Sequence, residues 1–462
     1  MPVHLHQPFV ALPGIVSGEG EMVEPQSSEA IGRRQAREAG RPECGGHFSS
    51  IDRIVVINDL AIAKGGGTGL ALLSIHLFRQ LGIPVTFICG DGGENADLAA
   101  LGVEVVALCG KPILLAGRAR SFVFALHNEA ARIMLERWIS AHDSARTIYH
   151  VHGWSQILSP SIFVELSRVA ERSVFHAHDY FLACPNGSFY HFPAARPCDC
   201  SPLSIGCLIS RCDKRSYMQK LWRVGRSARL RSILSSAAST GQRIILIHER
   251  MARTFERAGF RADTLYTVRN PVVPYLAERV RAEDNTEFFF IGRLEPDKGV
   301  EDAVRAARSA GVVLTVIGDG SLKERLSGVA GNIRVLGWQS HGAIATHIRR
   351  ARALLMPTPE PFGLVAVEAS QSGVPVILSD KACLAQEMSA AGIGISCDTT
   401  SSTAFASAIR RVAEMRPSDI ELMSAMAHDR VVALATTPEE WRDALLGHYL
   451  SLLERKPEYQ LC

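Results

Sequence analysis

The sequence lacks any long uninterrupted apolar run and any strong excess of charge. No stretch approaches the roughly 18 to 20 apolar residues that a membrane-spanning helix requires, so we expect no transmembrane segment. Lysine and arginine number 50 against 47 aspartate and glutamate, which gives a formal net charge of +3. A nearly neutral chain has no global field that attracts nucleic acid, so we expect no nucleic-acid partner and only local anion sites.

The start of the chain also lacks the basic segment of a secretory signal, because MPVHLHQPFVALPGIV carries no lysine or arginine and Pro13 interrupts its apolar run. We therefore expect a cytoplasmic protein. The eleven cysteines are then expected to be thiols or metal ligands rather than disulfides. Residues 1–50 show no hydrophobic periodicity, which predicts a disordered extension.

What the chain does have is length and an alternating pattern. Its 462 residues exceed a typical single core, and 47% hydrophobic and 21% charged residues are ordinary for a soluble globular protein. From residue 51, strand-like apolar runs alternate with amphipathic helical stretches, and the series restarts after TVRNPVVP. This predicts two α/β domains, over 51–275 and 276–437, whose ligands bind beyond the carboxyl ends of parallel strands.

The first candidate ligand loop is LAIAKGGGTGLALL, residues 60–73, in which three consecutive glycines precede a predicted helix. Gly66 and Gly67 would let the backbone approach a phosphate, which free amides and the helix dipole stabilise. The spacing departs from the dinucleotide fingerprint, and no lysine followed by serine or threonine closes the loop as in the Walker motif. A phosphate cradle and a flexible turn are both open interpretations.

A second loop lies in FFFIGRLEPDKGV, residues 288–300, where Arg293 and Lys298 directly follow an aromatic strand. Either a ligand with two or more negative charges docks there, or the segment is an ordinary solvated turn. Further along, PTPEPFGLVAVEASQSGVPVILSD carries Glu360 and Glu368. A helical rise would separate these carboxylates by roughly 12 Å. Retaining hydrolases need about 5 Å, so we predict that the two carboxylates hold separate hydroxyls of one long ligand.

Together these motifs resemble the donor site of glycosyltransferase family 4, whose members are retaining enzymes of the GT-B fold. The motifs that follow the family's order are KGGGTG, HVHG, HAHDY, RNPV, Gly292-Arg293 with Lys298, VIGDGSLKERL, IRVLGW, Glu360-x7-Glu368 and SGVPVI. The resemblance covers roughly residues 52–455. It implies two Rossmann-like domains with a cleft between them and a C-terminal helix, within 438–462, that crosses back to the first domain.

The resemblance implies a nucleotide-diphosphate sugar as donor substrate and no cofactor or metal for catalysis. Arg293 and Lys298 would neutralise the diphosphate, and they would do so most strongly as charge grows on the leaving group. Glu368 would bind the ribose, and Glu360 the donor sugar. The implied donor-binding residues are Gly66, Gly67, Arg293, Lys298, Glu360, Phe362, Gly363, Leu364 and Glu368.

The implied catalytic residues are His178, Arg293, Lys298 and Glu360. His178 follows a predicted strand in VFHAHDYF and matches the family's functional histidine, although His176 faces the same side of the sheet. A histidine that only caps the strand and bonds to Asp179 is the alternative. The family implies retention by same-face attack, without a dedicated protein nucleophile.

These observations predict a retaining glycosyltransferase of the hexosyltransferase type, acting on a glycan or lipid-linked acceptor in cell-surface or exopolysaccharide biosynthesis. The alternatives are a non-catalytic nucleotide-sugar-binding protein and another GT-B enzyme such as an epimerase. IHER, residues 247–250, replaces a commoner serine-containing family motif, which leaves the acceptor open.

Two segments lie outside the donor motifs. An insertion at 184–212 carries five cysteines, for which free thiols, disulfides and a structural zinc site are open interpretations. The predicted zinc ligands are Cys184, Cys198, Cys207 and Cys212. Residues 214–234 combine many basic residues with interleaved apolar ones. They predict a helix that either makes a peripheral contact with an anionic membrane or packs with its charges facing water.

Overall fold

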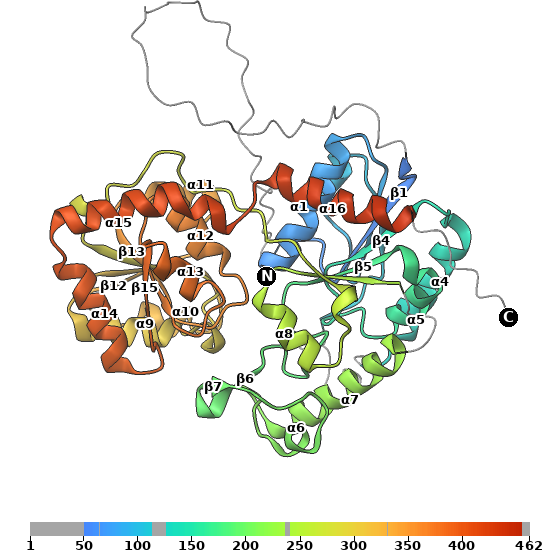
Figure 1. Ribbon diagram of the computed structural model, residues 1–462, viewed down its shortest axis with the longest axis horizontal. Helices are drawn as coiled ribbons and strands as arrows, with labels where there is room; N and C mark the ends of the chain where they lie inside the picture. Colours follow the sequence, from blue (N-terminus) through green and yellow to red (C-terminus); the bar gives the residue numbers. More distant parts are fainter. Residues whose placement is uncertain (1–49, 64, 113–125, 236–240, 330, 455–462) are drawn as a thin grey trace, which may run out of the picture.

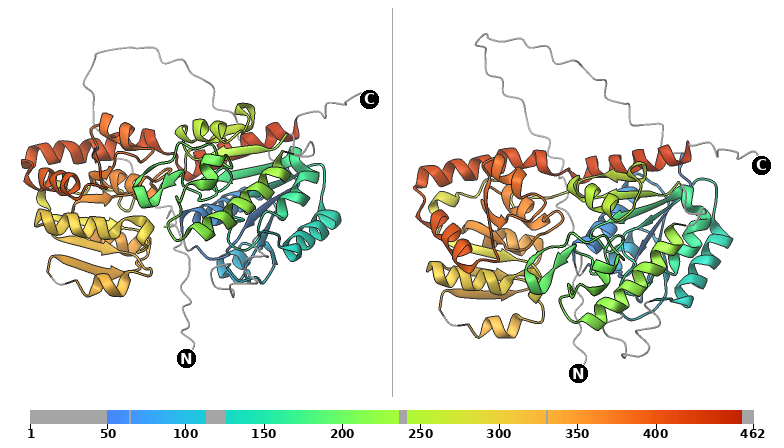
Figure 2. Two further views of the ribbon diagram at one scale, coloured as in Figure 1. Left: turned by 90° about the horizontal axis from the view of Figure 1, so that it is seen from below. Right: turned by 60° about the horizontal axis from the view of Figure 1, so that its bottom comes forward.

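The computed structural model describes residues 50–63, 65–112, 126–235, 241–329 and 331–454. Within these ranges the chain forms two α/β domains that lie side by side, each around a parallel sheet (Figure 1). Figure 2 shows the two domains from below and with the bottom turned forward. The predicted fold class is therefore confirmed. The extension predicted for residues 1–50 lies outside the described residues, apart from Ser50.

The first domain contains a seven-stranded sheet in the order β3-β2-β1-β4-β5-β8-β9, with every neighbouring pair parallel. The strands are β1 (Arg53–Asn58), β2 (Val85–Cys89), β3 (Glu104–Ala107), β4 (Thr147–Val151), β5 (Ser173–Ala177), β8 (Arg243–Leu246) and β9 (Leu265–Thr267). All side chains of β2, β4 and β5 are buried, as expected for a parallel sheet that helices cover on both faces.

Helices and one irregular insertion surround this sheet. The helices are α1 (Gly66–Gln80), α2 (Ala96–Ala100), α4 (Glu129–His142), α5 (Ile162–Leu166), α7 (Tyr217–Leu234) and α8 (Arg250–Arg257). Between β5 and α7 lies the cysteine-rich insertion, at the bottom of Figure 1. Its regular structure consists of β6 (Tyr190–His191), a 3-10 helix at Phe192–Ala194, β7 (Arg196–Pro197) and α6 (Ile205–Ile209).

The second domain contains a six-stranded parallel sheet in the order β12-β11-β10-β13-β14-β15. Its strands are β10 (Glu287–Ile291), β11 (Leu314–Ile317), β12 (Ile333–Gly337), β13 (Ala351–Met356), β14 (Val376–Ser379) and β15 (Gly394–Cys397). Its helices are α9 (Val300–Ala310), α10 (Lys323–Ser327), α11 (His341–Ile348), α12 (Leu364–Gln371), α13 (Ala385–Ala390), α14 (Ser402–Glu414) and α15 (Pro417–Arg430). The strand order is that of a dinucleotide-binding sheet.

The chain crosses between the domains twice. The first crossing follows β9, and the second follows α15 and leads into α16 (Pro438–Leu453), which runs back across the first domain (Figure 1). The crossings are bonded to each other, because Val272 N donates to Thr436 O at 3.0 Å and Thr436 N donates to Asn270 O at 3.4 Å. Trp441 and Tyr449 of α16 are fully buried in the core of the first domain.

The apolar core is continuous across the domain boundary. One cluster of buried side chains contains residues of both sheets, for example Val55 of β1 and Leu354 of β13. Leu364, at the start of α12, packs against this cluster and against the cluster beneath α16. In the described part of the chain, no helix is long and apolar enough to cross a membrane.

Candidate functional site

The two glycine-capped helix starts of the candidate site meet between the domains. A Cβ atom built on Gly66 would lie 3.1 Å from Leu364 Cδ1, and one built on Gly67 would lie 3.3 Å from His178 Cδ2. Gly66 and Gly67 begin α1, Leu364 begins α12, and His178 directly follows β5. The structure therefore brings four of the predicted site residues together at the carboxyl ends of strands from both sheets.

The first turns of α1 and α12 are available to an anion. The cap residues Gly65 and Gly363 offer no side-chain oxygen, and neither helix start has a side-chain cap. The first N–H groups of a helix have no partner within that helix and lie at the positive end of its dipole, where phosphates bind. Gly363 has φ 82°, and a Cβ there would lie 2.8 Å from Met356 Sδ, so only glycine fits this cap.

Gly67 in the glycine loop has little room for a side chain. We expect Gly67→Val to lower the free energy of unfolding by about 1–3 kcal/mol, because its methyl groups would be forced against the ring of His178. Gly69→Ala is the matched control, since a Cβ there meets nothing within 4 Å. That change lies inside α1 and should stabilise the helix by about 1 kcal/mol. Urea unfolding measures both, and equal midpoints for the two variants would contradict the close contact.

The predicted cations are already paired with carboxylates. Lys298 Nζ donates to Glu360 Oε1 at 2.6 Å, and Thr358 Oγ1 donates to the same oxygen at 3.0 Å. Arg293 Nη2 lies 3.6 Å from Asp297 Oδ2. The structure thus joins Lys298 directly to Glu360. In the described residues the ion-pair partner of Arg293 is Asp297, which is not one of the predicted donor residues. An incoming diphosphate would compete with both carboxylates.

Asp297 connects this loop to the other domain. Its Oδ2 accepts a hydrogen bond at 2.6 Å from Lys214 Nζ, which follows the cysteine-rich insertion. Burial raises the pKa of Asp297, but the hydrogen bond from Lys214 and the charges of Lys214, Arg293 and Lys298 lower it more, so the net direction is downward. Asp297 is therefore a charged bridge between the insertion and the predicted donor loop.

Glu368 lies apart from the ion pairs and has its own partner. Tyr275 Oη donates to Glu368 Oε2 at 2.7 Å. Burial raises the pKa of Glu368 to about 7, although the hydrogen bond from Tyr275 acts in the opposite direction. Phe362, another predicted donor contact, is only 2% exposed and belongs to the apolar core. Phe362 therefore anchors the chain in the apolar core two residues before α12 begins.

His178 ends a row of four histidines at the carboxyl ends of β4 and β5. His150 and His152, at the end of one strand, face His176 and His178 at the end of the other, with neighbouring rings 4.0–5.3 Å apart between centroids. His178 Nε2 shares a hydrogen bond of 2.9 Å with His152 Nδ1, and His178 Nδ1 is buried without a partner. Burial lowers the pKa of His178 to about 3, so its ring is neutral. The Cδ2 edge of the His178 ring faces Gly67. Of its two nitrogens, Nε2 is hydrogen-bonded to His152 and Nδ1 is buried.

The IHER segment forms a contact between the domains. His248 is 1% exposed, and its Nε2 shares a hydrogen bond of 2.9 Å with Glu387 Oε1 on α13. Arg250 donates to Gln386 on the same helix. Arg269 Nη1 donates to Glu387 Oε2 at 2.8 Å, and its Nη2 donates to Glu249 Oε2 at 2.7 Å. The departure from the family motif therefore coincides with an interdomain ion network.

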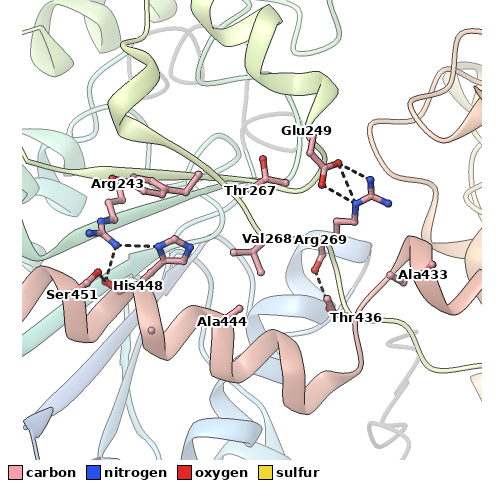
Figure 3. A pocket seen from close by; sticks show the side chains of 13 residues that line it. Arg243, Glu249, Thr267, Val268, Arg269, Ala433, Thr436, Ala444, His448 and Ser451 are labelled. Atoms are coloured by element: carbon pink, nitrogen blue, oxygen red, sulfur yellow. Dashed lines mark hydrogen bonds and ion pairs between the residues drawn. The ribbon is translucent and has the colours of Figure 1, made fainter. Parts of the chain in front are cut away.

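A groove between α16 and the strands β8 and β9 lies elsewhere and carries none of the predicted donor residues (Figure 3). Its two arginines are already paired: Arg243 Nη1 is 3.0 Å from His448 Nδ1, and Arg269 binds Glu249. Burial, with the charge of Arg243, lowers the pKa of His448 to about 4. We therefore place the candidate site at the glycine loops rather than in this groove.

Two groups in the described residues bring three possible metal ligands within 4.8 Å of one another, and neither contains a cysteine. One is His150, His152 and His176, where His150 Nε2 bonds His176 and its Nδ1 bonds Tyr449 Oη at 2.6 Å. The other is His248, Glu249 and Glu387, where the guanidinium of Arg269 already bridges the carboxylates.

Sequence comparison matches the second domain to a known family. Residues 276–427 match the family model described as Glycosyl transferases group 1. The chain is 28% identical over 260 residues to the glycogen synthase of Mycobacterium tuberculosis, covering 52% of this chain and 59% of that protein. It is 29% identical over 160 residues to the D-inositol 3-phosphate glycosyltransferase of Mycobacterium bovis, covering 32% of this chain and 31% of that protein. The match thus spans less than two thirds of these relatives.

Solved structures share the fold across both domains. Sucrose-phosphate synthase from Thermosynechococcus elongatus superposes with a TM-score of 0.63 at 16% identity, covering 87% of this chain and 99% of that one. HepE from Anabaena, in complex with UDP, superposes with a TM-score of 0.58 at 16% identity, covering 86% and 100%. WaaG, a glycosyltransferase involved in lipopolysaccharide biosynthesis, gives a TM-score of 0.61 at 14% identity, covering 85% and 100%. The fold is therefore GT-B.

Proposed function

We propose that this chain is a retaining glycosyltransferase of family 4 that transfers a sugar from a nucleotide-diphosphate sugar to a glycan or lipid-linked acceptor. The observation that carries the proposal is the meeting of two uncapped helix starts, at Gly66 of the first domain and at Leu364 of the second domain, which also holds the Lys298–Glu360 pair. The match of the second domain to group 1 glycosyl transferases supports it, as do UDP and UDP-glucose complexes of a protein with the same fold.

The donor is proposed to lie with its diphosphate at the start of α12. There the free amides of Gly363 and Leu364 and the cations Arg293 and Lys298 would surround the phosphates. When the diphosphate takes over Lys298, Glu360 is released to accept hydrogen bonds from sugar hydroxyls. Glu368, at the far side of α12's first turns, would accept hydrogen bonds from the ribose.

Bond cleavage is proposed to leave positive charge on the anomeric carbon and negative charge on the departing diphosphate. Lys298, Arg293 and the α12 amides stabilise that growing negative charge more than the ground state, which lowers the barrier. The carboxylate of Glu360 is tied to Lys298 before the donor binds, so it serves charge and hydroxyl recognition rather than attack. The leaving phosphate then accepts the proton of an acceptor hydroxyl that approaches from the same face.

The test is a donor screen on the purified chain. We expect a nucleotide-diphosphate sugar to raise the melting temperature, and transfer to a glycan or lipid-linked acceptor to release the nucleoside diphosphate with retained anomeric configuration by NMR. Donor binding without release in the presence of any acceptor of this class would support the non-catalytic binder instead. An inverted product would overturn the retaining assignment.

A lipid-linked acceptor would suit the surface formed by α6 and the start of α7. Ile205, Ile209 and Met218 are 78%, 69% and 73% exposed there, with the exposed Arg211 and Arg215 beside them. Tyr217 Oη donates to Leu208 O at 2.9 Å, which holds the two helices together. The predicted basic helix is present as α7, but not all its charges face water, because Lys220 and Arg226 are buried.

We propose that this apolar tip contacts an anionic membrane surface. Met218→Asp and Ile209→Asp are expected to abolish flotation with vesicles that contain anionic lipid, because they put a carboxylate where apolar side chains would enter the lipid. Leu422→Asp, at a 60% exposed position on α15, is the matched control and should float as the parent chain does. Flotation that is absent in the parent chain, or unchanged by the tip variants, would remove the membrane contact.

A further inference from the structure

The cysteine-rich insertion has almost no apolar core of its own. None of residues 190–229, all of which the structure describes, is a buried member of the three apolar clusters. The insertion's regular structure consists of two-residue strands, a three-residue 3-10 helix and a five-residue α-helix. A segment of this size that cannot bury enough apolar surface needs another source of stability, commonly disulfides or a structural metal.

Five thiols gather in this insertion. Cys184 Sγ donates to Asn186 Oδ1 at 3.1 Å, and Asn186 Nδ2 lies 3.4 Å from Cys212 Sγ, so these two sulfurs lie on either side of one amide group. Cys200 lies beside Cys198, with Cys207 and Cys212 nearby. All five cysteines are free, which leaves disulfides without support.

A buried cation lies beside these thiols without a carboxylate partner. Lys220 is 0% exposed, and its Nζ donates to the carbonyls of Cys207, Leu208 and Ser210, the last two at 3.2 and 2.6 Å. Among the ion pairs of the described residues, none includes Lys220. A buried charge without a counter-charge is costly. Four thiolates around a divalent ion carry a net charge of about −2, which would supply that counter-charge.

The backbone around three of the predicted ligands is held by hydrogen bonds. Cys184 N donates to Tyr180 O at 2.7 Å. Arg257 Nη2 donates to Cys198 O at 3.0 Å, and Cys207 N donates to Ser204 Oγ at 3.2 Å.

We propose that Cys184, Cys198, Cys207 and Cys212 bind one structural Zn²⁺ ion. Zinc–sulfur bonds of about 2.3 Å would place the sulfurs about 3.8 Å apart. No three of these thiols lie within 4.8 Å of one another in the described residues. The proposal therefore requires the sulfurs to move inward when the ion binds. Deprotonation of the thiols releases their protons to solvent as the metal binds.

The site would control the bridge to the second domain. Cys212 is followed by Asp213, whose buried carboxylate binds Arg223 at 2.8 Å, and by Lys214, which reaches Asp297 across the boundary. A fixed Cys212 therefore fixes Lys214. Loss of the metal would release Lys214 from Asp297. Asp297 would then pair with Arg293 alone and would compete with a donor phosphate for this arginine.

Metal analysis of the full chain, purified under reducing conditions, tests the proposal without any activity assay. We expect one zinc per chain, and Co²⁺ loading that gives the visible bands of tetrahedral cobalt–thiolate. Cys198→Ser and Cys207→Ser should reduce bound zinc at least tenfold, whereas Cys397→Ser, in the second domain, should keep one zinc. Cys200→Ser is the control inside the cluster and should also keep it.

The wild-type Co²⁺ titration keeps the proposal testable if the serine variants fail to fold. A chain that contains no zinc and develops no cobalt–thiolate bands would overturn the site. Zinc retained by Cys184→Ser but lost by Cys200→Ser would overturn the assignment of Cys184 as a ligand. Lys220→Met should weaken zinc binding about tenfold, since it removes the compensating charge, and unchanged affinity would contradict that role. None of these outcomes depends on transferase activity.

Discussion

Lys298→Gln is expected to lower the rate of sugar transfer at least a hundredfold. The lysine would stabilise charge that develops on the departing diphosphate, and loss of one such contact costs about 3 kcal/mol in the transition state. Arg308→Gln removes a cation of the same domain from the last turn of α9, at the end away from the donor loop, and should leave the rate unchanged. Single-turnover kinetics at saturating donor measure both.

The substitution Lys298→Gln has a second effect, because it also removes the partner that lies 2.6 Å from Glu360. The double variant Lys298→Gln with Glu360→Gln separates the two effects. If the lysine acts on the diphosphate, the double variant stays at least as slow as Lys298→Gln. Recovery to near the parent rate would show that an unpaired Glu360, and not lost leaving-group stabilisation, caused the defect.

Donor affinity is expected to rise with pH through the titration of Glu368. Its pKa of about 7 in the folded protein means that the ionised form, which we propose accepts hydrogen bonds from the ribose hydroxyls, is the minority below neutrality. An affinity scales with the populated fraction of the competent form, so KM for the donor should fall about tenfold between about pH 6 and 8. Glu368→Gln should show a higher KM that no longer changes over this range. A KM in the parent chain that does not vary with pH would rule out this role.

The same carboxyl makes stability pH-dependent, with a definite sign. The folded pKa of about 7 lies above the ordinary value of 4.5, so between these values the folded state keeps a proton that the unfolded state has lost. Stability contributed by this group is therefore greatest below about pH 4.5 and is lost as the pH rises towards 7. Urea unfolding of Glu368→Gln should show a flatter pH profile than the parent chain in that window.

The sequence was sufficient for the fold and for the local parts of the site. Alternating strand and helix patterns predicted both parallel sheets. The resemblance to family 4 assigned Lys298 and Glu360 to one donor site, and the structure pairs these two side chains. These features depend on periodicity and on loops that follow strands. Such signals are contained within short windows of the chain.

What the sequence could not show depends on contacts between distant segments. The hydrogen bond of His178 is with His152, which follows another strand and lies 26 residues earlier in the chain. Tyr275, Lys214 and Asp297 gave no motif signal, because each acquires its role only from a partner on another element. The burial of Lys220 was missed for the same reason, since its partners are backbone carbonyls.

The paired crossings near Thr436 limit how the two domains can move. Because two segments, bonded to each other at Val272 and Thr436, link the lobes at one place, sliding or twisting of one lobe against the other would break those bonds. Bending of the two lobes about that place would leave those hydrogen bonds intact. Any opening for the exit of a spent nucleotide should therefore pivot there, and the gap should widen most at the rim farthest from it.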